Sequence, residues 1–513
     1  MEDACLLGID VGTTGTKALL IDVQGKTVAC AVHEYPLLTP HPGWAEQDPN
    51  RWWTATTDVI RRVIKAAGGS ASRIAAVGLT GQMHGATLLD RAGEVLRPAI
   101  LWNDQRTARE CNEIAERVGA DRVLQLTGNP VLTGFTAPKL LWTRRHEPEI
   151  YAKIAAVLLP KDYVRYRLTG QRRSDVSDAS GTALFNVADR QWSDEMLDAV
   201  GVPREWLPEV AESPEVTAQV SKSAAEETGL LAGTPVVAGA GDQAAQAVGT
   251  GIVEEGIVSV TIGTSGVVFA ASDRYLVEPQ GKLHAFCHAV PGMWHLMGVM
   301  LSAGGSFRWY RDTLGDDECG RATAEHRDPY DVLTESAACA PAGCEGLIFL
   351  PYLTGERTPH ADPDARGVFF GLSLGHGKEH LTRAVMEGVA YGLRDSLELI
   401  GGLRLEMREV RVSGGGARSR LWRQILADVF DAPIVTMDVS EGAAFGAALL
   451  AGVGGGVFDS IGHACGAVLH ATGRLEPGPD VDTYRKHYSR YRALYPALAS
   501  EFHRMADTMS SGD

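Results

Sequence analysis

The sequence lacks the signatures of several common protein classes. Its eight cysteines are scattered, and no two of them have the Cys-x-x-Cys spacing of a zinc or redox site. The 58 glycines and 24 prolines follow no short period, which excludes collagen-like and low-complexity chains. Walker A loops, Gly-x-Ser-x-Gly elbows, His-Glu-x-x-His pairs and protein-kinase motifs are also missing. We therefore expect reduced cysteines, no structural zinc and none of these enzyme classes.

Basic runs and long apolar runs are missing too. The formal net charge is −16 and no Lys/Arg-rich segment occurs, so we expect no nucleic-acid partner and no anionic membrane partner. The longest uncharged stretch, residues 442–458, falls just short of a membrane span and predicts a buried helix followed by a glycine loop. Acidic residues at the start lead directly into an apolar strand, so we predict a cytoplasmic protein with no signal peptide.

The sequence does contain an alternation of short strands and helices, which predicts an α/β fold with parallel sheet segments. Two similar strand–turn–strand units stand out, at residues 5–21 around the turn GTTG and at residues 257–270 around the turn GTSG. They suggest a duplicated domain. Because 513 residues exceed what one hydrophobic core usually holds, we predict two domains, residues 1–246 and residues 247–513.

The two turns are candidate phosphate sites. Asp10 ends the first apolar strand just before Gly12, Thr13 and Thr14. Glycines let a phosphate approach the backbone, and successive amides and hydroxyls can donate to its oxygens. A carboxylate at this strand end can hold Mg²⁺ directly or through water. The alternative is an ordinary hairpin with an Asp at its turn, but the second copy at 263–266 favours a pair of loops that grip a polyphosphate.

Asp242 follows a predicted strand at residues 235–240 and begins an alanine-rich helix. One interpretation is a helix N-cap. The other is a general base that accepts a hydroxyl proton during phosphoryl transfer. The two roles are compatible, because a cap residue at a strand end can also reach a substrate.

A glycine run, Gly414–Gly416, lies between a predicted strand at 409–412 and a predicted helix at 419–430. With Asp438 about 20 residues further on as a ribose ligand, it resembles an imperfect dinucleotide-binding turn. A loop that supports adenosine and a plain strand–helix packing contact are the alternatives, and the pattern alone leaves all three open.

Met83, His84 and Trp102 each follow a predicted strand. His84 is either a satisfied structural residue or a ligand for substrate hydroxyls. Met83 would then be an adaptable apolar wall beside it. Trp102 can stack on a sugar or belong to the ordinary core.

Taken together, these segments resemble the FGGY family of carbohydrate kinases, with the greatest similarity to members that act on D-xylulose. The resemblance runs from Gly8 to about Leu450, and several contiguous matches in the right order are more specific than any single loop. The most telling matches lie at residues 81–90, 97–104, 134–139, 350–360 and 413–419.

The resemblance implies two ribonuclease H-like (actin-like ATPase) domains flanking a central cleft, with the sugar on the N-terminal domain and ATP on the C-terminal one. It implies that Asp242 is the catalytic base and that Asp10 serves the Mg²⁺–phosphate end. The implied sugar contacts are Met83, His84, Trp102, Asp242 and Gln243. The implied nucleotide contacts are Gly12, Thr13, Thr14, Gly263, Thr264, Gly304, Gly415 and Gly416.

The implied activity is ATP-dependent phosphorylation of D-xylulose at its 5-hydroxyl, with a sugar and ATP as partners and homodimer formation left open. An ordinary Asp242, with a pKa near ~3.9, would be ionised at neutral pH. Gln243 stands where many xylulose-acting members have Asn, whereas Gln82–His84 replaces the Arg-Glu pair of glycerol-acting members. The alternatives are another FGGY sugar or polyol kinase (ribulose, gluconate or glycerol), an actin-like ATPase switch and, third, a nicotinamide dehydrogenase.

Overall fold

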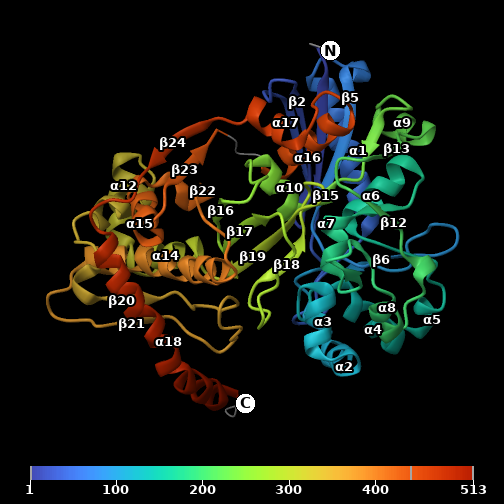
Figure 1. The fold of residues 1–513 in the computed structure, drawn as a ribbon. Coiled ribbons are helices and arrows are strands. Elements are labelled where there is room, and N and C mark those ends of the chain that lie inside the picture. The colour runs from blue at the N-terminus through green and yellow to red at the C-terminus, as the bar shows by residue number, and fades with distance from the viewer. Residues whose placement is uncertain (1–2, 439–441, 511–513) are drawn as a thin grey trace.

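The computed structural model describes residues 3–438 and 442–510, and these residues form two seven-stranded mixed sheets with helices packed around them (Figure 1). In the first sheet the strand order is β13-β14-β5-β1-β2-β3, and the short strand β15 also pairs with β5. The bounds are β1 Cys5–Val11, β2 Gly15–Asp22, β3 Thr27–Glu34, β5 Ile74–Gly81, β13 Val216–Gln219, β14 Pro235–Val237 and β15 Ala240–Gly241.

The second sheet has the order β18-β19-β17-β16-β22-β23-β24. Its bounds are β16 Ile257–Ile262, β17 Gly266–Ser272, β18 His284–Cys287, β19 Trp294–Met300, β22 Glu409–Ser413, β23 Ile434–Met437 and β24 Ala471–Leu475.

The two sheets repeat one topology. In the first, β1 pairs antiparallel with β2 and parallel with β5, and β5 pairs parallel with β14. In the second, β16 pairs antiparallel with β17 and parallel with β22, and β22 pairs parallel with β23. Each predicted hairpin therefore opens one copy of the same sheet, which is the duplication that the two turns suggested.

The strand predicted over residues 235–240 is instead two strands, β14 and β15, separated at Ala238 and Gly239. Gly239 has φ +87°, and a Cβ there would lie 2.3 Å from the carbonyl oxygen of Leu79. Because only glycine adopts this conformation at no cost, the chain bends here before it enters the helix that follows.

Helices cover both sheets, and the first one begins with an Asp cap followed by proline. Asp48 caps α1 (Pro49–Ala66) by accepting from the Asn50 amide, and Pro49 is the first helical residue. The other helices used below are α6 Pro160–Thr169, α7 Val176–Ala179, α10 Asp242–Gly249, α11 Gly304–Leu314, α12 Asp316–Glu325, α13 Pro329–Ala337, α14 Lys378–Gly402, α15 Arg420–Phe430, α16 Gly442–Gly454, α17 Ile461–Val468 and α18 Val481–Ser510.

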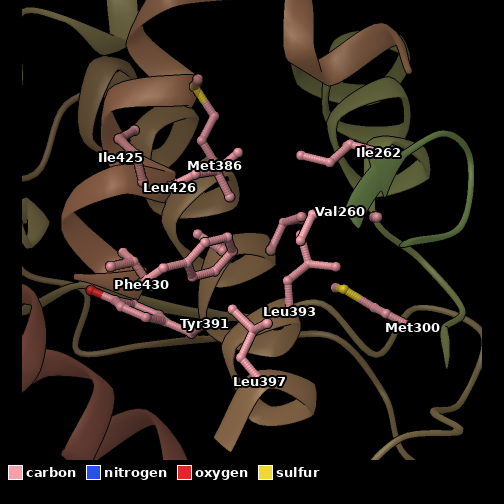
Figure 2. Packing of buried hydrophobic residues seen from close by; sticks show 14 of the residues in the cluster. Val260, Ile262, Met300, Met386, Tyr391, Leu393, Leu397, Ile425, Leu426 and Phe430 are labelled. Atoms are coloured by element: carbon pink, nitrogen blue, oxygen red, sulfur yellow. The ribbon is translucent and has the colours of Figure 1, made fainter. Parts of the chain in front are cut away.

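The core of the second unit lies between its sheet and helices α14 and α15. Figure 2 shows Val260 of β16 beside Leu393 of α14. Tyr391 of α14 and Phe430 of α15 lie together on the other side of the same cluster, which also contains Leu426 of α15. These residues are almost fully buried, and such burial supplies most of the stabilising free energy of a domain.

Helix α16, late in the chain, packs against the first sheet and against α10, and Figure 1 shows it beside β2 and β5. The contact is backbone to backbone. A Cβ on Gly446 would lie 1.8 Å from the Ala245 carbonyl oxygen, and one on Gly8 would lie 1.9 Å from the Ala444 carbonyl oxygen. Glycines on both sides thus let the two units meet without intervening side chains.

The uncharged stretch at 442–458 does begin with a buried helix, α16. Among the described residues, every helix is either too short or too polar to cross a bilayer. The predicted boundary between residues 246 and 247 lies inside α10 and stays a prediction.

Candidate active site

Asp10 and Asp242 lie at the same edge of the first sheet. The central strand β5 pairs in parallel with β1, where Thr80 is opposite Asp10, and with β15, where Gly81 is opposite Gly241. Because the three strands run in one direction, their carboxyl ends meet, and Asp242 follows β15 directly. Two carboxylates from segments more than 230 residues apart are thereby brought to one place.

Burial in this edge raises the pKa of both carboxyls. The pKa of Asp10 rises to about 6, partly offset by Lys17. The pKa of Asp242 rises to about 7, through burial first and through the charge of Asp10 second. The expectation of an ordinary, fully ionised Asp242 is therefore wrong, because a second carboxylate faces it in a desolvated edge.

Asp242 is the first residue of α10, and Gly241 occupies the N-cap position. The Asp242 Oδ1 accepts from the amide of the next helical residue, Gln243, at 2.7 Å. The N-cap interpretation is therefore wrong by one position, since Asp242 is the first helical residue and lies at the sheet edge.

The first turn is fixed by its own hydrogen bonds. The Gly12 amide donates to the Gly15 carbonyl at 3.0 Å, and the Tyr35 hydroxyl donates to the Gly12 carbonyl at 2.6 Å. In the described parts of the chain, the amides of Thr13 and Thr14 donate to no protein acceptor. A phosphate at this turn would therefore meet these two amides, and not that of Gly12.

Trp102 lies over this turn. Its Nε1 donates to the Thr13 hydroxyl at 3.0 Å, and 45% of the residue is exposed. The core interpretation of Trp102 is therefore wrong, and the indole is an exposed face beside the phosphate loop.

Two glutamines that the sequence analysis did not assign hold Thr13 from the other side. Gln82 Oε1 accepts from the Thr13 hydroxyl at 3.1 Å, and Gln47 Nε2 donates to the Thr13 carbonyl at 2.6 Å. Gln82 Nε2 donates to Gln47 Oε1 at 3.0 Å, which orients both amides. No local pattern reveals this pair, because its members come from distant segments.

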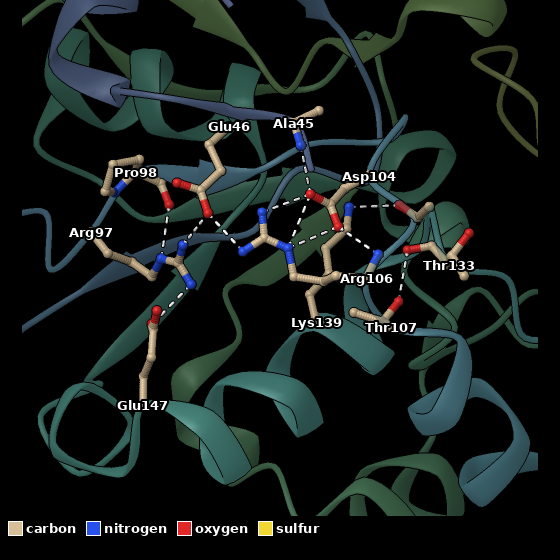
Figure 3. A network of polar contacts seen from close by, with 11 residues as sticks. Ala45, Glu46, Arg97, Pro98, Asp104, Arg106, Thr107, Thr133, Lys139 and Glu147 are labelled. Atoms are coloured by element: carbon tan, nitrogen blue, oxygen red, sulfur yellow. Dashed lines mark hydrogen bonds and ion pairs between the residues drawn. The ribbon is translucent and has the colours of Figure 1, made fainter. Parts of the chain in front are cut away.

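The loop that carries Trp102 is anchored by a buried ion network (Figure 3). Asp104 accepts from the Ala45 amide at 2.7 Å and from Arg106 Nη2 at 2.7 Å, and both of its partners are buried with it. Glu46 binds both Arg106 and Arg97. Fully paired, this network fixes the position of the indole that precedes it.

His84 has a defined protonation state. Its Nδ1 lies 2.5 Å from the Gly181 carbonyl, so Nδ1 carries the proton and donates, and Nε2 is the acceptor. Burial lowers the pKa of His84 to about 3, which keeps the ring neutral. The ring stacks on Phe135 at 4.7 Å, and a Cβ on Gly181 would lie 2.5 Å from it. A neutral imidazole held this way can accept from a substrate hydroxyl.

Met83 lies beside His84 and beside the catalytic edge, by which we mean the strand ends that carry Asp10 and Asp242. It is buried, and a Cβ on Gly241 would lie 3.0 Å from its Cγ and Sδ. The apolar side chain therefore borders the position directly before Asp242.

A second group of predicted residues lines a cavity of about 370 Å³ in the other unit. The Gly304 amide, at the start of α11, donates to the Gly263 carbonyl at 2.8 Å, and the Gly305 amide donates to the Thr264 carbonyl at 3.0 Å. This ties the second turn to the helix N-terminus. The predicted residues in the lining are Gly263, Thr264, Gly304, Gly415 and Gly416.

Helix α10 connects the two groups. Asp242 starts the helix, and Gln246, about one turn later, donates through Nε2 to the Thr261 hydroxyl at 3.2 Å. Thr261 stands two residues before Gly263. The carboxylate edge and the second turn are therefore separated by about one helical turn and the end of one strand.

The dinucleotide interpretation of Gly414–Gly416 finds no support at Asp438. The carboxylate of Asp438 accepts from the His470 amide at 3.1 Å, and Asp438 is not part of the cavity lining. The glycine loop instead lines the cavity beside the start of α11.

Comparison with known proteins decides the family. The profile of the FGGY family of carbohydrate kinases, N-terminal domain, matches residues 5–249, and the profile of its C-terminal domain matches residues 258–455. The chain belongs to the FGGY family of carbohydrate kinases. The similarity extends over nearly the whole chain. A xylulose kinase of Escherichia coli K12 is 44% identical over 495 residues, which cover 96% of this chain and 99% of the relative.

Solved structures of FGGY kinases agree with the fold. A xyloylose kinase from Brucella ovis has a TM-score of 0.89 at 41% identity and covers 97% of this chain and 99% of its own. A xylulose kinase from Rhodospirillum rubrum has a TM-score of 0.91 at 34% identity, and the match covers 97% of this chain and 100% of the other. The chain is therefore an ATP-dependent carbohydrate kinase with two ribonuclease H-like (actin-like) domains.

In this FGGY kinase the cavity also has lining residues that the sequence analysis missed. Arg308 comes from α11, and Tyr330, Asp331 and Thr334 come from α13. They lie in an ordinary amphipathic helical pattern, so no signal in the sequence separates them from surface residues.

Proposed function

We propose that the protein transfers the γ-phosphoryl group of ATP to the 5-hydroxyl of D-xylulose, giving D-xylulose 5-phosphate and ADP. The observation that carries the proposal is the position of Asp242, at a sheet edge beside a phosphate turn and beside the Met83–His84 segment. The relatives of nearly equal length named above favour a ketopentose over other sugars.

The sugar would lie on the N-terminal unit, residues 1–246. The acceptor nitrogen Nε2 of His84 suits a sugar hydroxyl, and Met83 supplies an apolar wall. The exposed Trp102 ring offers a face for the C–H groups of the sugar. Gln243, one residue beyond the base, has an amide within reach of a further hydroxyl.

Asp242 would orient the 5-hydroxyl and accept its proton while the new O–P bond forms and the bond from the γ-phosphorus to the bridging oxygen of ADP breaks. A carboxylate with a pKa of about 7 is a better proton acceptor than an ordinary one and is still largely ionised at slightly alkaline pH. The Nε2 of the neutral His84 and the indole of Trp102 would hold the sugar in line for this attack.

Asp10 and the hydroxyls of Thr13 and Thr264 are hard oxygen donors of the kind that Mg²⁺ prefers. The charge of Asp10 raises the pKa of Asp242, and Lys17, opposite Asp10 on β2, only partly offsets the raised pKa of Asp10, so a bound cation would be favourable at this edge. When bound, Mg²⁺ would neutralise charge on the phosphate oxygens.

ATP would lie on the C-terminal unit, residues 247–513, with its base and ribose in the cavity of about 370 Å³. At Gly304, Gly415 and Gly416 the cavity wall is backbone alone, which leaves room for the nucleotide there. The phosphates would reach the amides of Thr13, Thr14 and Thr264 at the two turns, with Gly12 and Gly263 shaping those turns.

The test is Asp242→Asn, which keeps the size of the side chain but cannot accept the proton. We expect D-xylulose phosphorylation to fall by about 10³-fold or more, while ATP binding measured by calorimetry stays within twofold of wild type. The matched control is Glu227→Gln, which should leave turnover unchanged. Glu227 lies on helix α9 (Lys222–Thr228), and its carboxylate accepts from Trp53 Nε1 at 2.8 Å. Substantial phosphorylation by the Asp242 variant would contradict the base assignment.

A further inference from the structure

Behind the catalytic edge lies a buried charge cluster. The ammonium of Lys161, on α6, lies 2.5 Å from Asp162 Oδ1, 2.7 Å from Asp175 Oδ2 and 3.5 Å from Asp178 Oδ2. All four side chains are at most 1% exposed. Three carboxyls at this spacing have the form of a cation site, and the ammonium occupies its centre.

The cluster is too costly to be incidental. Burying charge is unfavourable unless every charge is paired, and here one cation faces three carboxyls. Burial raises the pKa of Asp178 well above its usual range, and the charge of Asp242 raises it further. The carboxylates of Asp242 and Asp178 therefore repel each other electrostatically.

A chain of hydrogen bonds leads from the cluster to the base. Asp175 Oδ2 faces Lys161, and Asp175 Oδ1 accepts from the Ser177 hydroxyl at 2.5 Å. The Ser177 oxygen in turn accepts from the Gly241 amide at 3.1 Å. The Gly241 amide belongs to the Ala240–Gly241 peptide, so the chain of hydrogen bonds ends on β15, at the backbone that leads directly into Asp242.

The Lys161 stem braces the same strand ends. A Cβ on Gly81 would lie 3.3 Å from Lys161 Cβ, and one on Gly239 would lie 3.3 Å from Lys161 Cδ. The side chain therefore fills the space under β5 and under the bend that separates β14 from β15. Lys161 therefore packs against the end of β5 and against the bend before β15, the two segments that lie beside Asp242.

We propose that Ser177 is a positioning residue for Asp242, held in place by the Lys161–Asp175 ion pair. The inference rests on the proposed role of Asp242 as the base. Ser177 is fully buried, and it would act through the Ala240–Gly241 peptide, whose position affects the direction in which the Asp242 carboxylate points. Rotation of that peptide would misplace the carboxylate relative to the 5-hydroxyl without changing the sugar or nucleotide contacts.

The test compares Ser177→Ala with Ser174→Ala. Ser174 is the matched control, because its buried hydroxyl also donates to a cluster carboxylate, Asp162 Oδ2 at 2.6 Å, but has no bond to β15. We expect Ser177→Ala to lower kcat by roughly 10-fold or more while both KM values stay within about twofold, as for a misplaced reacting group. Ser174→Ala should lower the melting temperature to a similar extent and leave kcat unchanged.

Equal losses of kcat in the two variants, or a rise in the sugar KM that accounts for the loss, would overturn the proposal. If Ser177→Ala does not fold, Ser177→Cys gives the same readout, because a thiol is similar in size and a weaker acceptor. Wild-type turnover is measured first on D-xylulose. If the wild type prefers another sugar, the proposed substrate is wrong, and Ser177 is then tested with the preferred sugar.

Discussion

At the scale of single residues, the site depends on how two carboxylates are kept apart from water and close to each other. Asp10 and Asp242 face one another at one sheet edge, and each has a raised pKa because burial disfavours its charge. His84 is kept neutral by the same desolvation. The edge therefore holds proton acceptors, and Lys17 on β2 is the cation that lowers the pKa of Asp10.

The raised pKa of Asp242 predicts the pH dependence of catalysis. The base works only when ionised, and its ionised fraction grows as the pH rises through about 7. We expect kcat/KM, measured with ATP at a saturating level, to rise about tenfold per pH unit below that value and to level off above it. A profile that is flat from pH 5.5 to 8 would show that proton acceptance by this group does not limit the reaction.

At the scale of elements, the two turns are the parts that the sequence predicted best. Each is a local pattern of glycine and threonine between two apolar strands, and local patterns need no knowledge of the rest of the chain. The same logic placed Asp10 and Asp242 at strand ends.

Other elements could not be predicted because distant contacts decide them. The bend at Gly239 requires glycine because its φ is +87° and a Cβ there would lie 2.3 Å from the Leu79 carbonyl oxygen. The Gln47–Gln82 pair and the Lys161 cluster join segments that no short motif connects. The pKa of Asp242 likewise depends on Asp10, which is far away in sequence.

The second turn is in close contact with the start of helix α11 through Gly304. A Cβ on Gly304 would lie 2.4 Å from the Gly263 carbonyl, so Gly304→Ala must push the turn away from α11. We expect the KM for ATP to rise roughly 10-fold, with the sugar KM unchanged, because a displaced loop no longer meets the phosphates.

The control for this variant is Gly320→Ala. Gly320 lies on helix α12, and a Cβ there meets no other atom within 4 Å. Its kinetics should equal those of wild type. A Gly304 variant with an unchanged ATP KM would mean that the turn does not contact the nucleotide.

At the scale of the whole molecule, the two units are joined by α10 and α16, whose backbones touch through glycines. Asp242 starts α10, and Gln246 of the same helix donates to Thr261, two residues before the second turn. The joint therefore determines how the carboxylate edge faces the nucleotide cavity.

Gly446→Ala tests the importance of this joint. Its Cβ would lie 1.8 Å from a backbone oxygen that cannot move without moving α10. We expect a loss of unfolding free energy of about 3 kcal/mol or more, seen as a lower melting temperature. Gly462→Ala, on α17 with open space around it, should lose no stability. An unaltered melting temperature for Gly446→Ala would contradict the close backbone packing.

The most direct test of the central claim is ADP release with Mg·ATP and a panel of ketopentoses, polyols and aldonates, alongside a reaction without sugar. We expect ADP release that depends on D-xylulose and exceeds the release with ribulose, gluconate or glycerol. A preference for one of these would leave the fold and Asp242 in place and overturn the substrate. Release that is equal with and without sugar would contradict phosphoryl transfer to a sugar and favour an ATPase switch.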